Sequence, residues 1–362
     1  MLVANAGSSS IKLALVDPEA EREEWATELE SDSTGVDDDA VAAALTELPA
    51  APDAVGHRVV HGGERFTAPV RLSPEVLAQL EELIELAPLH QPKALELVRA
   101  LQRALPESPA VACFDTSFHA TLPRAAATYA LPKSWRERHG LRRFGFHGLS
   151  HAHASRQARR MAPPGTRIVT CHLGAGASLC AVHDGRSVDT SMGFTPLEGL
   201  PMATRSGSVD PGLLLWLQPR EGLSPAEMTE ALEHQAGLVG LAGTSDMREV
   251  IERTDTDADA ALALEVYVHR LRAGVAAMAA AMGGLDTLVF TGGVGERAPA
   301  VRSLTCAGLA HLGVELDDRR NRDAEPDVEV GTAGAAVRVL VLRAREDLEI
   351  ARGTQAALAG SG

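Results

Sequence analysis

The stretch LVANAGSSSIKLALVD, Leu2–Asp17, predicts two strands joined by a tight turn. Apolar residues flank a run of small ones, and Gly7 can adopt turn geometry without steric cost. Further along the chain, the same pattern of an apolar run followed by glycine or small polar residues recurs in AVACFDTS, RIVTCHLGAGAS and DTLVFTGGVGE. Helices are predicted near Asp39–Leu48, over Ser73–Leu86, from Ser224 and over Ala258–Met282. Strands alternating with helices predict an α/β fold.

Length and charge limit the function classes. A chain of 362 residues predicts two domains. A net charge of −15 argues against a broad electrostatic grip on nucleic acid or on an acidic membrane. Residues 18–52 are acidic and rich in proline and alanine, and we expect them to form an exposed connection around the first helix.

The cysteines and the N-terminal sequence bear on the compartment. The four cysteines are widely spaced without a CxxC pair, which favours buried free thiols and a reducing environment. No basic segment followed by an apolar one opens the chain. The longest uncharged apolar stretch, Ala273–Leu285, is shorter than the ~20 residues of a membrane span. We therefore expect a cytoplasmic protein.

Turns that carry glycine and follow strand-like runs are candidates for binding phosphate: Asn5–Ser10, Leu173–Ser178 and Thr291–Glu296. Glycine lets backbone N–H groups approach phosphate oxygens without a Cβ in the way. None is a GxxxxGK[ST] loop, and none fits GxGxxG before a helix. Taken singly, each is a weak signal and more typical of an ordinary turn than of a phosphate site.

Charged candidates lie mostly among glycines and small residues. The cationic ones are Lys12, Arg58, His147, Arg205 and Arg248. An arginine in such surroundings can fork onto a carboxylate or phosphate, although a surface ion pair is the alternative. Asp115 ends a strand-like run and could hold Mg²⁺ or orient an arginine, whereas spacing alone makes Glu346 a solvated helix charge.

A metal site built from histidines is disfavoured. His147, His151 and His153 are closely spaced, but no third ligand of the HExxH kind accompanies them. Gly148 also indicates that His147 lies in a turn.

Taken together, these segments resemble the acetate kinase family over nearly the whole chain. The matching stretches, in order, are NAGSSSIK, GHRVVHGGE, APLHQP, FDTSFH, RRFGFHGLSH, HLGAGAS, VDTSMGFTPLEGLPMATRSGSVDP, FTGGVGE and EDLEIAR. The resemblance implies the two-domain α/β fold of acetate and sugar kinases, heat-shock ATPases and actin, with an active-site cleft between the domains. The implied division is an N-terminal acetokinase domain of residues 1–117 plus 347–362 and a C-terminal nucleotide-binding domain of residues 118–346.

The resemblance also implies the reaction. This is reversible phosphoryl transfer between ATP and acetate, giving ADP and acetyl phosphate, with Mg²⁺ or Mn²⁺ as cofactor. A cytoplasmic homodimer without nucleic-acid or membrane partners is expected. Propionate, butyrate or a donor other than ATP remain alternatives, as does a non-catalytic nucleotide-binding protein of the same fold.

Residue roles follow by matching motifs. The implied catalytic residues are Arg58, Asp115, His147 and Arg205. The implied carboxylate-binding residues are Arg58, Val60, Leu89, Phe146 and Pro196. The implied nucleotide-binding residues are Lys12, His172, Leu173, Gly174, Ala175, Gly176, Asp246, Met247, Arg248, Gly292, Gly293, Val294, Gly295 and Glu296. The implied metal-site residues are Asn5 and Glu346, which replaces the surface interpretation of Glu346.

This chemistry is physically reasonable. A carboxylate is ionised at pH 7 and needs no general base. The enzyme must align two anions and stabilise charge on the equatorial oxygens, which two arginines, an imidazole and Mg²⁺ can do. His147 is therefore expected to act as an electrostatic hydrogen-bond donor and not as a base.

Three positions depart from the family's pattern. Ala175 and Arg345 stand where asparagine is usual, and Arg297 follows Glu296 where the family has asparagine. All three concern the nucleotide or metal side. Donor identity is thus less determined by the sequence than the reaction class.

Overall fold

The computed structural model describes residues 1–7, 10–30, 35–88 and 90–360. The chain forms two compact units. Unit 1 comprises Met1–Ala120, Phe146–His153 and Arg345–Gly362, and unit 2 comprises Thr121–Gly145 and Ala154–Ala344. The predicted boundaries assign residues 146–153 to the second domain, whereas here they pack with unit 1.

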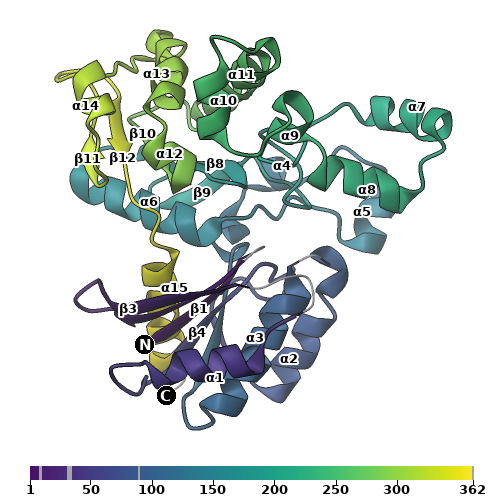
Figure 1. The fold of residues 1–362 in the computed structure, drawn as a ribbon, viewed down its shortest axis with the longest axis vertical. Helices are drawn as coiled ribbons and strands as arrows, with labels where there is room; N and C mark the ends of the chain where they lie inside the picture. The colour runs from purple at the N-terminus through teal and green to yellow at the C-terminus, as the bar shows by residue number, and fades with distance from the viewer. Residues whose placement is uncertain (8–9, 31–34, 89, 361–362) are drawn as a thin grey trace. The chain divides into compact units, whose positions relative to one another are not determined.

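Unit 1 is built on a sheet of mixed strand direction (Figure 1). Its strands, in spatial order, are β3 (Arg22–Glu30), β2 (Ser10–Asp17), β1 (Leu2–Ala6), β4 (Val55–Val59), β6 (Ala110–Phe114) and β5 (Val70–Arg71). The neighbours β1, β4 and β6 are parallel, and the outer strands are antiparallel to them. The predicted strand–turn–strand of Leu2–Asp17 is confirmed as β1 and β2.

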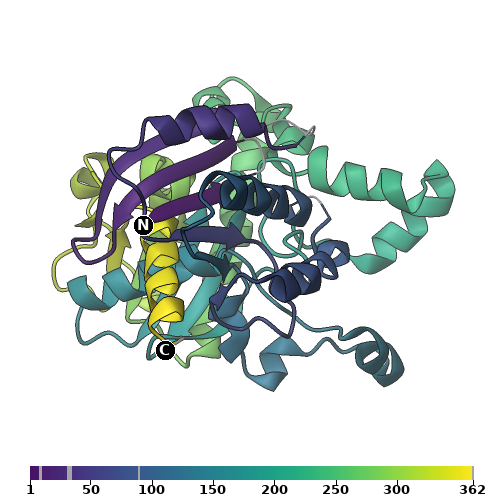
Figure 2. The ribbon, with the colours of Figure 1, turned by 90° about the horizontal axis from the view of Figure 1, so that it is seen from below.

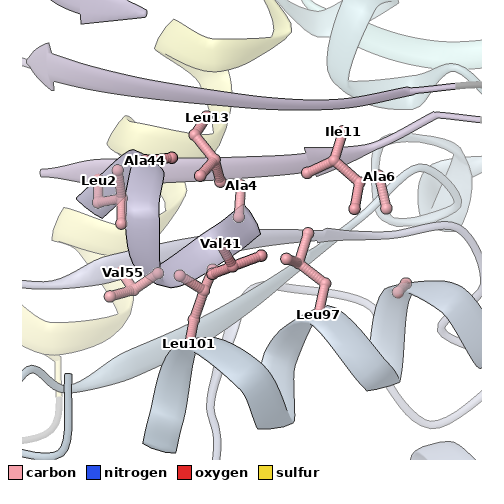
Figure 3. Packing of buried hydrophobic residues seen from close by; sticks show 11 residues of the cluster. Leu2, Ala4, Ala6, Ile11, Leu13, Val41, Ala44, Val55, Leu97 and Leu101 are labelled. Atoms are coloured by element: carbon pink, nitrogen blue, oxygen red, sulfur yellow. The ribbon is translucent and has the colours of Figure 1, made fainter. Parts of the chain in front are cut away.

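Helices cover both faces of this sheet. The helices of unit 1 are α1 (Asp38–Thr46), α2 (Pro74–Glu81), α3 (Gln91–Ala104) and α15 (Glu346–Ala359), with 3₁₀ turns at Ile84–Leu86 and Ser117–Thr121. Side chains alternate between the faces of a strand. Leu2 and Ala4 of β1 therefore pack toward α1 and α3 (Figure 3), while Val3 packs with Ile350 of α15. Figure 2 shows α15, in yellow, alongside the strands of this sheet.

Close approach of α15 to the sheet depends on a glycine in β4. A Cβ on Gly56 would lie 2.7 Å from Cγ2 of Ile350 and 2.3 Å from Oγ1 of Thr354. A side chain there would force the helix away from the strand, so Gly56 lets the middle of α15 pack against the centre of the sheet.

Unit 2 is built on a second sheet, which has the same pattern of strand directions as the first when it is read from the opposite edge. Its strands are β11 (Val328–Glu329), β12 (Arg338–Val341), β10 (Thr287–Thr291), β7 (Arg167–Leu173), β8 (Ala177–His183) and β9 (Arg186–Thr190). Here β12, β10 and β7 are parallel, and the flanking strands are antiparallel. The two units thus repeat one topology, although the sequence shows no internal repeat by eye.

The helices of unit 2 include the two predicted near Ser224 and Ala258. They are α4 (Arg124–Ala127), α5 (Lys133–His139), α7 (Pro211–Glu221), α8 (Pro225–His234), α9 (Gly237–Ala242), α10 (Met247–Arg253), α11 (Ala258–Ala281), α12 (Gly292–Arg297), α13 (Pro299–Ala307) and α14 (Asp318–Arg322), with a 3₁₀ turn at Ala310–Leu312. Helix α6 (Gly148–Met161) begins in unit 1 and continues into unit 2. The capping box predicted at Ser224 is present, with Glu227 as its second member.

Two local predictions were wrong. Residues 18–52 contain the strand β3 as well as α1, because Trp25, Thr27 and Leu29 alternate with charged residues along an edge strand. The helix predicted over Ser73–Leu86 ends at Glu81 and gives way to a 3₁₀ turn. Within the described part of the chain, no helix has the length and apolar character needed to cross a membrane.

Candidate active site

Polar side chains from separate segments of unit 1 form one connected chain of hydrogen bonds. The guanidinium of Arg58 donates to Asp115 through Nη2, 2.6 Å from Oδ2, and through Nε, 3.1 Å from Oδ2. Its Nη1 donates to Oδ1 of Asn5 at 3.1 Å. Nδ2 of Asn5 donates in turn to Oε2 of Glu346 at 3.4 Å. Four residues predicted from distant motifs are therefore brought together.

The sheet explains why these residues meet. Asn5, Arg58 and Asp115 lie at or just after the carboxyl ends of β1, β4 and β6, which are parallel neighbours. Carboxyl ends of parallel strands converge at one edge of a sheet, where ligand sites commonly form. Glu346 is the first residue of α15, a helix that packs against the same strands.

The electrostatics of this cluster favour a permanently charged arginine. Burial opposes the charge of Arg58, but the carboxylates of Asp115 and, more weakly, Glu346 raise its pKa above the ordinary value. The Asp115 side chain is almost fully buried, and Arg58 keeps about one sixth of its side chain exposed, at 16%. Asp115 thus holds the guanidinium in one orientation while part of the fork stays accessible.

His147 adopts an uncommon backbone conformation beside Asp115. Its φ is 55°, in the left-handed region that non-glycine residues seldom occupy. The next residue, Gly148, donates from its N–H to the carbonyl oxygen of Asp115 at 2.9 Å. A Cβ on Gly148 would lie 2.1 Å from that oxygen, so only glycine allows the contact. The strained His147 is therefore anchored next to the Arg58–Asp115 pair.

The predicted carboxylate-pocket residues of unit 1 are buried and well supported. Val60 and Phe146 are 6% and 1% exposed. The ring of Phe146 lies against His61 edge-to-face at 5.5 Å, and its carbonyl oxygen is 3.0 Å from Nε2 of His119. Gln91 receives the N–H of His61 and donates to its carbonyl oxygen. Leu89, also predicted here, lies outside the described residues.

The supporting residues His61, Gln91 and His119 were not predicted to have roles. Burial lowers the pKa of His61 to about 4, and Nδ1 of this imidazole accepts the N–H of Gly63. Burial likewise lowers the pKa of His119 to about 4. The available signal was that these residues occur within GHRVVHGGE, APLHQP and FDTSFH.

Lys12 is placed less favourably than predicted from its motif. It is the cross-strand partner of Asn5, so the two side chains leave the sheet on one face. Its ammonium group, however, pairs with Glu23 at 3.1 Å and is largely exposed.

Glu346 fits the chemistry of a magnesium site better than Asn5 does. Mg²⁺ is commonly held by one or two carboxylates together with substrate phosphates and water. The carboxylate of Glu346 meets this need, whereas the amide oxygen of Asn5 faces Arg58 and its amide nitrogen faces Glu346. Among the described residues, no cluster of three or more His, Cys, Asp or Glu forms a ready-made metal site.

In unit 2, two of the predicted glycine turns lie side by side. Strands β7 and β10 are parallel neighbours, with His172 aligned with Thr291, so both turns leave the same edge. Gly292 has a φ of 78°, and a Cβ there would lie 2.8 Å from the carbonyl oxygen of Leu173. Gly292 and Gly295 therefore pack closely against Leu173, the residue from which the turn Gly174–Gly176 starts.

Some backbone N–H groups in these turns already have partners. The N–H of Gly174 donates to the carbonyl oxygen of Gly176 at 2.9 Å. The N–H of Gly292 donates to Oε1 of Glu296, which also accepts the N–H of Ala344 at 2.9 Å. The segment Gly292–Glu296, predicted as a turn, lies in the short helix α12, and Glu296 ties this helix to the segment that follows β12.

A pocket of about 520 Å³ adjoins this helix and is rich in arginine. Its lining includes Gly293, Glu296, Arg297, Arg302, Arg322 and Arg343. Arg302 is buried and donates to the carbonyl oxygens of Gly295 and Glu296, both at 2.8 Å. Arg302 thus fixes the C-terminal end of α12, a role that was not predicted from the sequence.

The remaining predicted residues of unit 2 lie in its loops. Burial lowers the pKa of Arg205 and the charge of Glu233 opposes that shift. Asp246 caps α10 and pairs with the exposed Arg248 at 2.7 Å, while Met247 is buried. Pro196 is half-buried in the loop after β9.

Sequence comparison identifies relatives over the whole chain. A family model described as the acetokinase family matches residues 34–352. The acetate kinase of Deinococcus radiodurans is 45% identical over 394 residues, covering 100% of this chain and 98% of that protein. The acetate kinase of Leifsonia xyli subsp. xyli is 45% identical over 397 residues, covering 99% of each.

Solved structures resemble the chain equally broadly. Porphyromonas gingivalis acetate kinase matches with a TM-score of 0.89 and 37% identity over 99% of both chains. A propionate kinase from Francisella tularensis matches with a TM-score of 0.89 and 36% identity over 98% of both.

Proposed function

The chain belongs to the acetokinase family, and from this premise we propose that it catalyses reversible phosphoryl transfer between ATP and acetate. Its fold is that of the solved acetate and propionate kinases, the α/β fold shared with actin-like ATPases. The observation that carries the proposal is the hydrogen-bonded chain Asp115–Arg58–Asn5–Glu346. It supplies a fixed cation beside a carboxylate suited to Mg²⁺.

In the proposed mechanism, Arg58 binds the carboxylate and the phosphoryl group during transfer. Asp115 orients the guanidinium through bonds to Nε and Nη2, which leaves Nη1 directed at Asn5. A fork that is already oriented loses little entropy when it meets a second anion. Between the two roles that the sequence left open for Asp115, this contact supports orientation of the arginine.

His147 is proposed to donate a hydrogen bond to the equatorial oxygens of the phosphoryl group. No proton needs to leave the carboxylate nucleophile, since acetate is ionised at neutral pH. The unusual φ of His147 and its anchoring through Gly148 support a positioned donor, because backbone strain of this kind persists where surrounding contacts enforce it. Arg205 is proposed to share the stabilisation of charge.

On the donor side, we propose that the turns Gly174–Gly176 and Gly292–Glu296, His172, and Asp246–Arg248 bind the nucleotide. The pocket beside Gly293 is of suitable size for its nucleoside end, and the arginines in its lining suit the negatively charged phosphates. Glu346, with Asn5 beside it, would hold Mg²⁺, which neutralises phosphate charge when bound.

Two coarser features complete the proposal. The exposed apolar residues of α7 favour a homodimer. The four cysteines are free and buried, which suits a reducing cytoplasm.

The test is an assay of the purified protein with Mg²⁺, ATP and a series of carboxylates, in which acyl phosphate is trapped as a hydroxamate. The series includes acetate, propionate and butyrate, because one structural neighbour is a propionate kinase. GTP and pyrophosphate serve as alternative donors. We expect acetyl phosphate from acetate and ATP. Absence of acyl phosphate with every acceptor and donor would refute the proposed function.

A further inference from the structure

The loop Ser191–Gly199, which follows β9 in unit 2, is held by an arginine from an earlier segment of the same unit. Nη1 of Arg143 donates to the carbonyl oxygens of Ser191, at 3.2 Å, and Met192, at 2.8 Å. Nη2 of Arg143 pairs with Oε1 of Glu198 at 2.6 Å. A single guanidinium therefore forms hydrogen bonds to both the beginning and the end of the loop.

A tyrosine completes the clamp. The hydroxyl of Tyr129 donates to Oε2 of Glu198 at 2.5 Å and accepts the N–H of Phe194 at 2.8 Å. Burial, reinforced by the bond to Glu198, raises the pKa of Tyr129, so the hydroxyl keeps its proton for this contact. The guanidinium of Arg143 also lies 5.5 Å from the centre of the Tyr129 ring. Both oxygens of Glu198 are thus used by two different donors.

The loop backbone is shaped to admit this clamp. A Cβ on Gly193 would lie 1.8 Å from Oε2 of Glu198 and 2.2 Å from the hydroxyl of Tyr129. The carbonyl oxygen of Gly193 accepts the N–H groups of Phe144 and Gly145, at 3.1 and 3.2 Å. The clamp therefore fixes not only the loop but also the residue that directly precedes Phe146 in the chain.

We propose that Tyr129, Arg143 and Glu198 are positioning residues that set the preference for acyl chain length. The inference rests on the proposed function and on the role that the family resemblance implies for Pro196, in the pocket for the methyl group. Pro196 lies between the anchored residues Gly193 and Glu198. None of the three positioning residues needs to touch the substrate.

The physical reason is that discrimination between carboxylates of different length depends on a rigid wall. One methylene in an apolar pocket changes kcat/KM by roughly 10–200-fold, but only when the wall cannot yield. Loosening the loop lets Pro196 move outward. Acetate then loses contacts, while propionate and butyrate gain room.

The experiment compares Tyr129→Phe and Glu198→Gln with the parent, using kcat and KM for acetate, propionate and butyrate at saturating donor. Tyr129→Phe removes one oxygen and keeps the ring, which makes it the smaller perturbation. We expect the ratio of kcat/KM for acetate to that for butyrate to fall about fivefold or more in each variant, within the range that one or two methylenes allow. The KM for the donor should remain unchanged.

Asp286→Asn is the matched control. Asp286 receives a bifurcated arginine contact from Arg167, together with the N–H of Thr166, in the same unit. Loss of the contact between Arg167 and Asp286 should lower the midpoint of thermal unfolding, as the clamp variants do. The ratio of kcat/KM for acetate to that for butyrate should stay as in the parent. Val60→Ala, which alters the pocket lining directly, is the positive control for a changed ratio.

The possible results separate two failures. If the parent phosphorylates acetate and the clamp variants lower all three carboxylates equally, or leave the ratio unchanged, the clamp is merely structural and the inference is wrong. If the parent phosphorylates no carboxylate, the proposed function itself fails. A variant of Glu198 that does not fold leaves the decision to Tyr129→Phe, whose ratio then supports or overturns the inference.

Discussion

Arg58 shows how much of the unit 1 site depends on geometry at a single residue. Its guanidinium makes hydrogen bonds through Nε, Nη1 and Nη2, to Asp115 and to Asn5. A lysine has the same charge but cannot reproduce this planar fork. Substituting Arg58 with lysine therefore separates the effect of the positive charge from the effect of the fork geometry.

We predict that Arg58→Lys lowers kcat for acetyl phosphate formation by roughly 10²-fold, the scale of losing a preorganised electrostatic donor. The KM for ATP should change little. The measurement is hydroxamate trapping over a range of acetate concentrations. Arg99→Lys, which alters an exposed ion pair with Glu81 in the same unit, is the control and should behave as the parent. A variant of Arg58 with near-normal kcat would contradict the fork mechanism.

A second prediction concerns the departures from the family pattern on the donor side. Ala175 is exposed and lacks the amide that an asparagine would direct at a phosphate, a bond to a charged group contributing about 1.5–3 kcal/mol. Arg297 is exposed and lines the arginine-rich pocket. We predict that Ala175→Asn lowers the KM for ATP several-fold without changing that for acetate.

If Arg297 compensates for the missing amide, Arg297→Ala should raise the KM for ATP more in the parent than in the Ala175→Asn background. The KM values for ATP of the parent, the two single variants and the double variant form a double-mutant cycle. Additive effects would show that the two positions act independently and remove the idea of compensation.

At the scale of the element, β4 places opposite chemistry on its two faces. Arg58 points toward the polar cluster, and the preceding residue, His57, points into the core on the other face. His57 is 1% exposed, and neither ring nitrogen has a hydrogen-bond partner among the described residues. Burial lowers the pKa of His57 to about 3.

Burial of His57 therefore predicts that the free energy of unfolding depends on pH. Below pH 6.5, unfolded chains bind a proton at His57 and folded ones do not, so stability falls as pH drops from about 6.5 toward 3. At ~1.4 kcal/mol per pH unit, His57 costs about 2–3 kcal/mol at pH 4.5 relative to pH 7. His57→Leu should remove this loss. Urea unfolding of parent and variant at pH 7.0 and 4.5 tests it, and an equal loss in both proteins would contradict it.

Strands could be predicted where their buried residues form a continuous apolar run, and not where only every second residue is partly buried. The strands β1, β6, β7 and β10 are each built around a buried apolar run followed by small or polar residues, and they were predicted. Strand β3 was missed because an edge strand exposes its charged residues and buries only every second position partly. The repeat of one topology in both sheets was also missed, since it is kept by strand pairing and not by similar residues.

The same limit applies to the candidate site. Arg58, in a glycine-flanked motif, and Asp115, at the end of an apolar run, were predicted and do meet. The residues that hold such groups in place, Gln91 and Glu198 among them, were not predicted. Their partners, the backbone of His61 for Gln91 and the side chains of Tyr129 and Arg143 for Glu198, lie far along the chain. Local sequence carries no record of those contacts.

At the scale of the whole molecule, the surface of α7 stands out. Leu213, Leu215 and Trp216 are 48%, 73% and 53% exposed, and no residue of this helix is buried. Figures 1 and 2 both show α7 at the end of an extension of unit 2. Apolar residues gathered in this way commonly mark an interface between subunits.

We predict that the protein is a homodimer and that α7 contributes to the interface. Leu215→Glu should then shift the molar mass measured by light scattering from dimer to monomer, because it buries a charge at an apolar contact. Leu304→Glu, at another exposed leucine of unit 2, is the control and should leave the dimer intact. A parent protein that is monomeric, or a Leu215→Glu variant that remains dimeric, would exclude this interface.

The discontinuous assembly of unit 1 has a consequence for its biosynthesis. Helix α15 covers one face of the unit 1 sheet, but a ribosome makes it only after Ala154–Ala344. At translation rates of ~5–20 residues per second, that interval lasts on the order of ten seconds or more. Val3, Val111 and their neighbours on this face stay uncovered throughout that time. Nascent chains of this protein are therefore expected to need a chaperone that shields an open sheet until translation reaches α15.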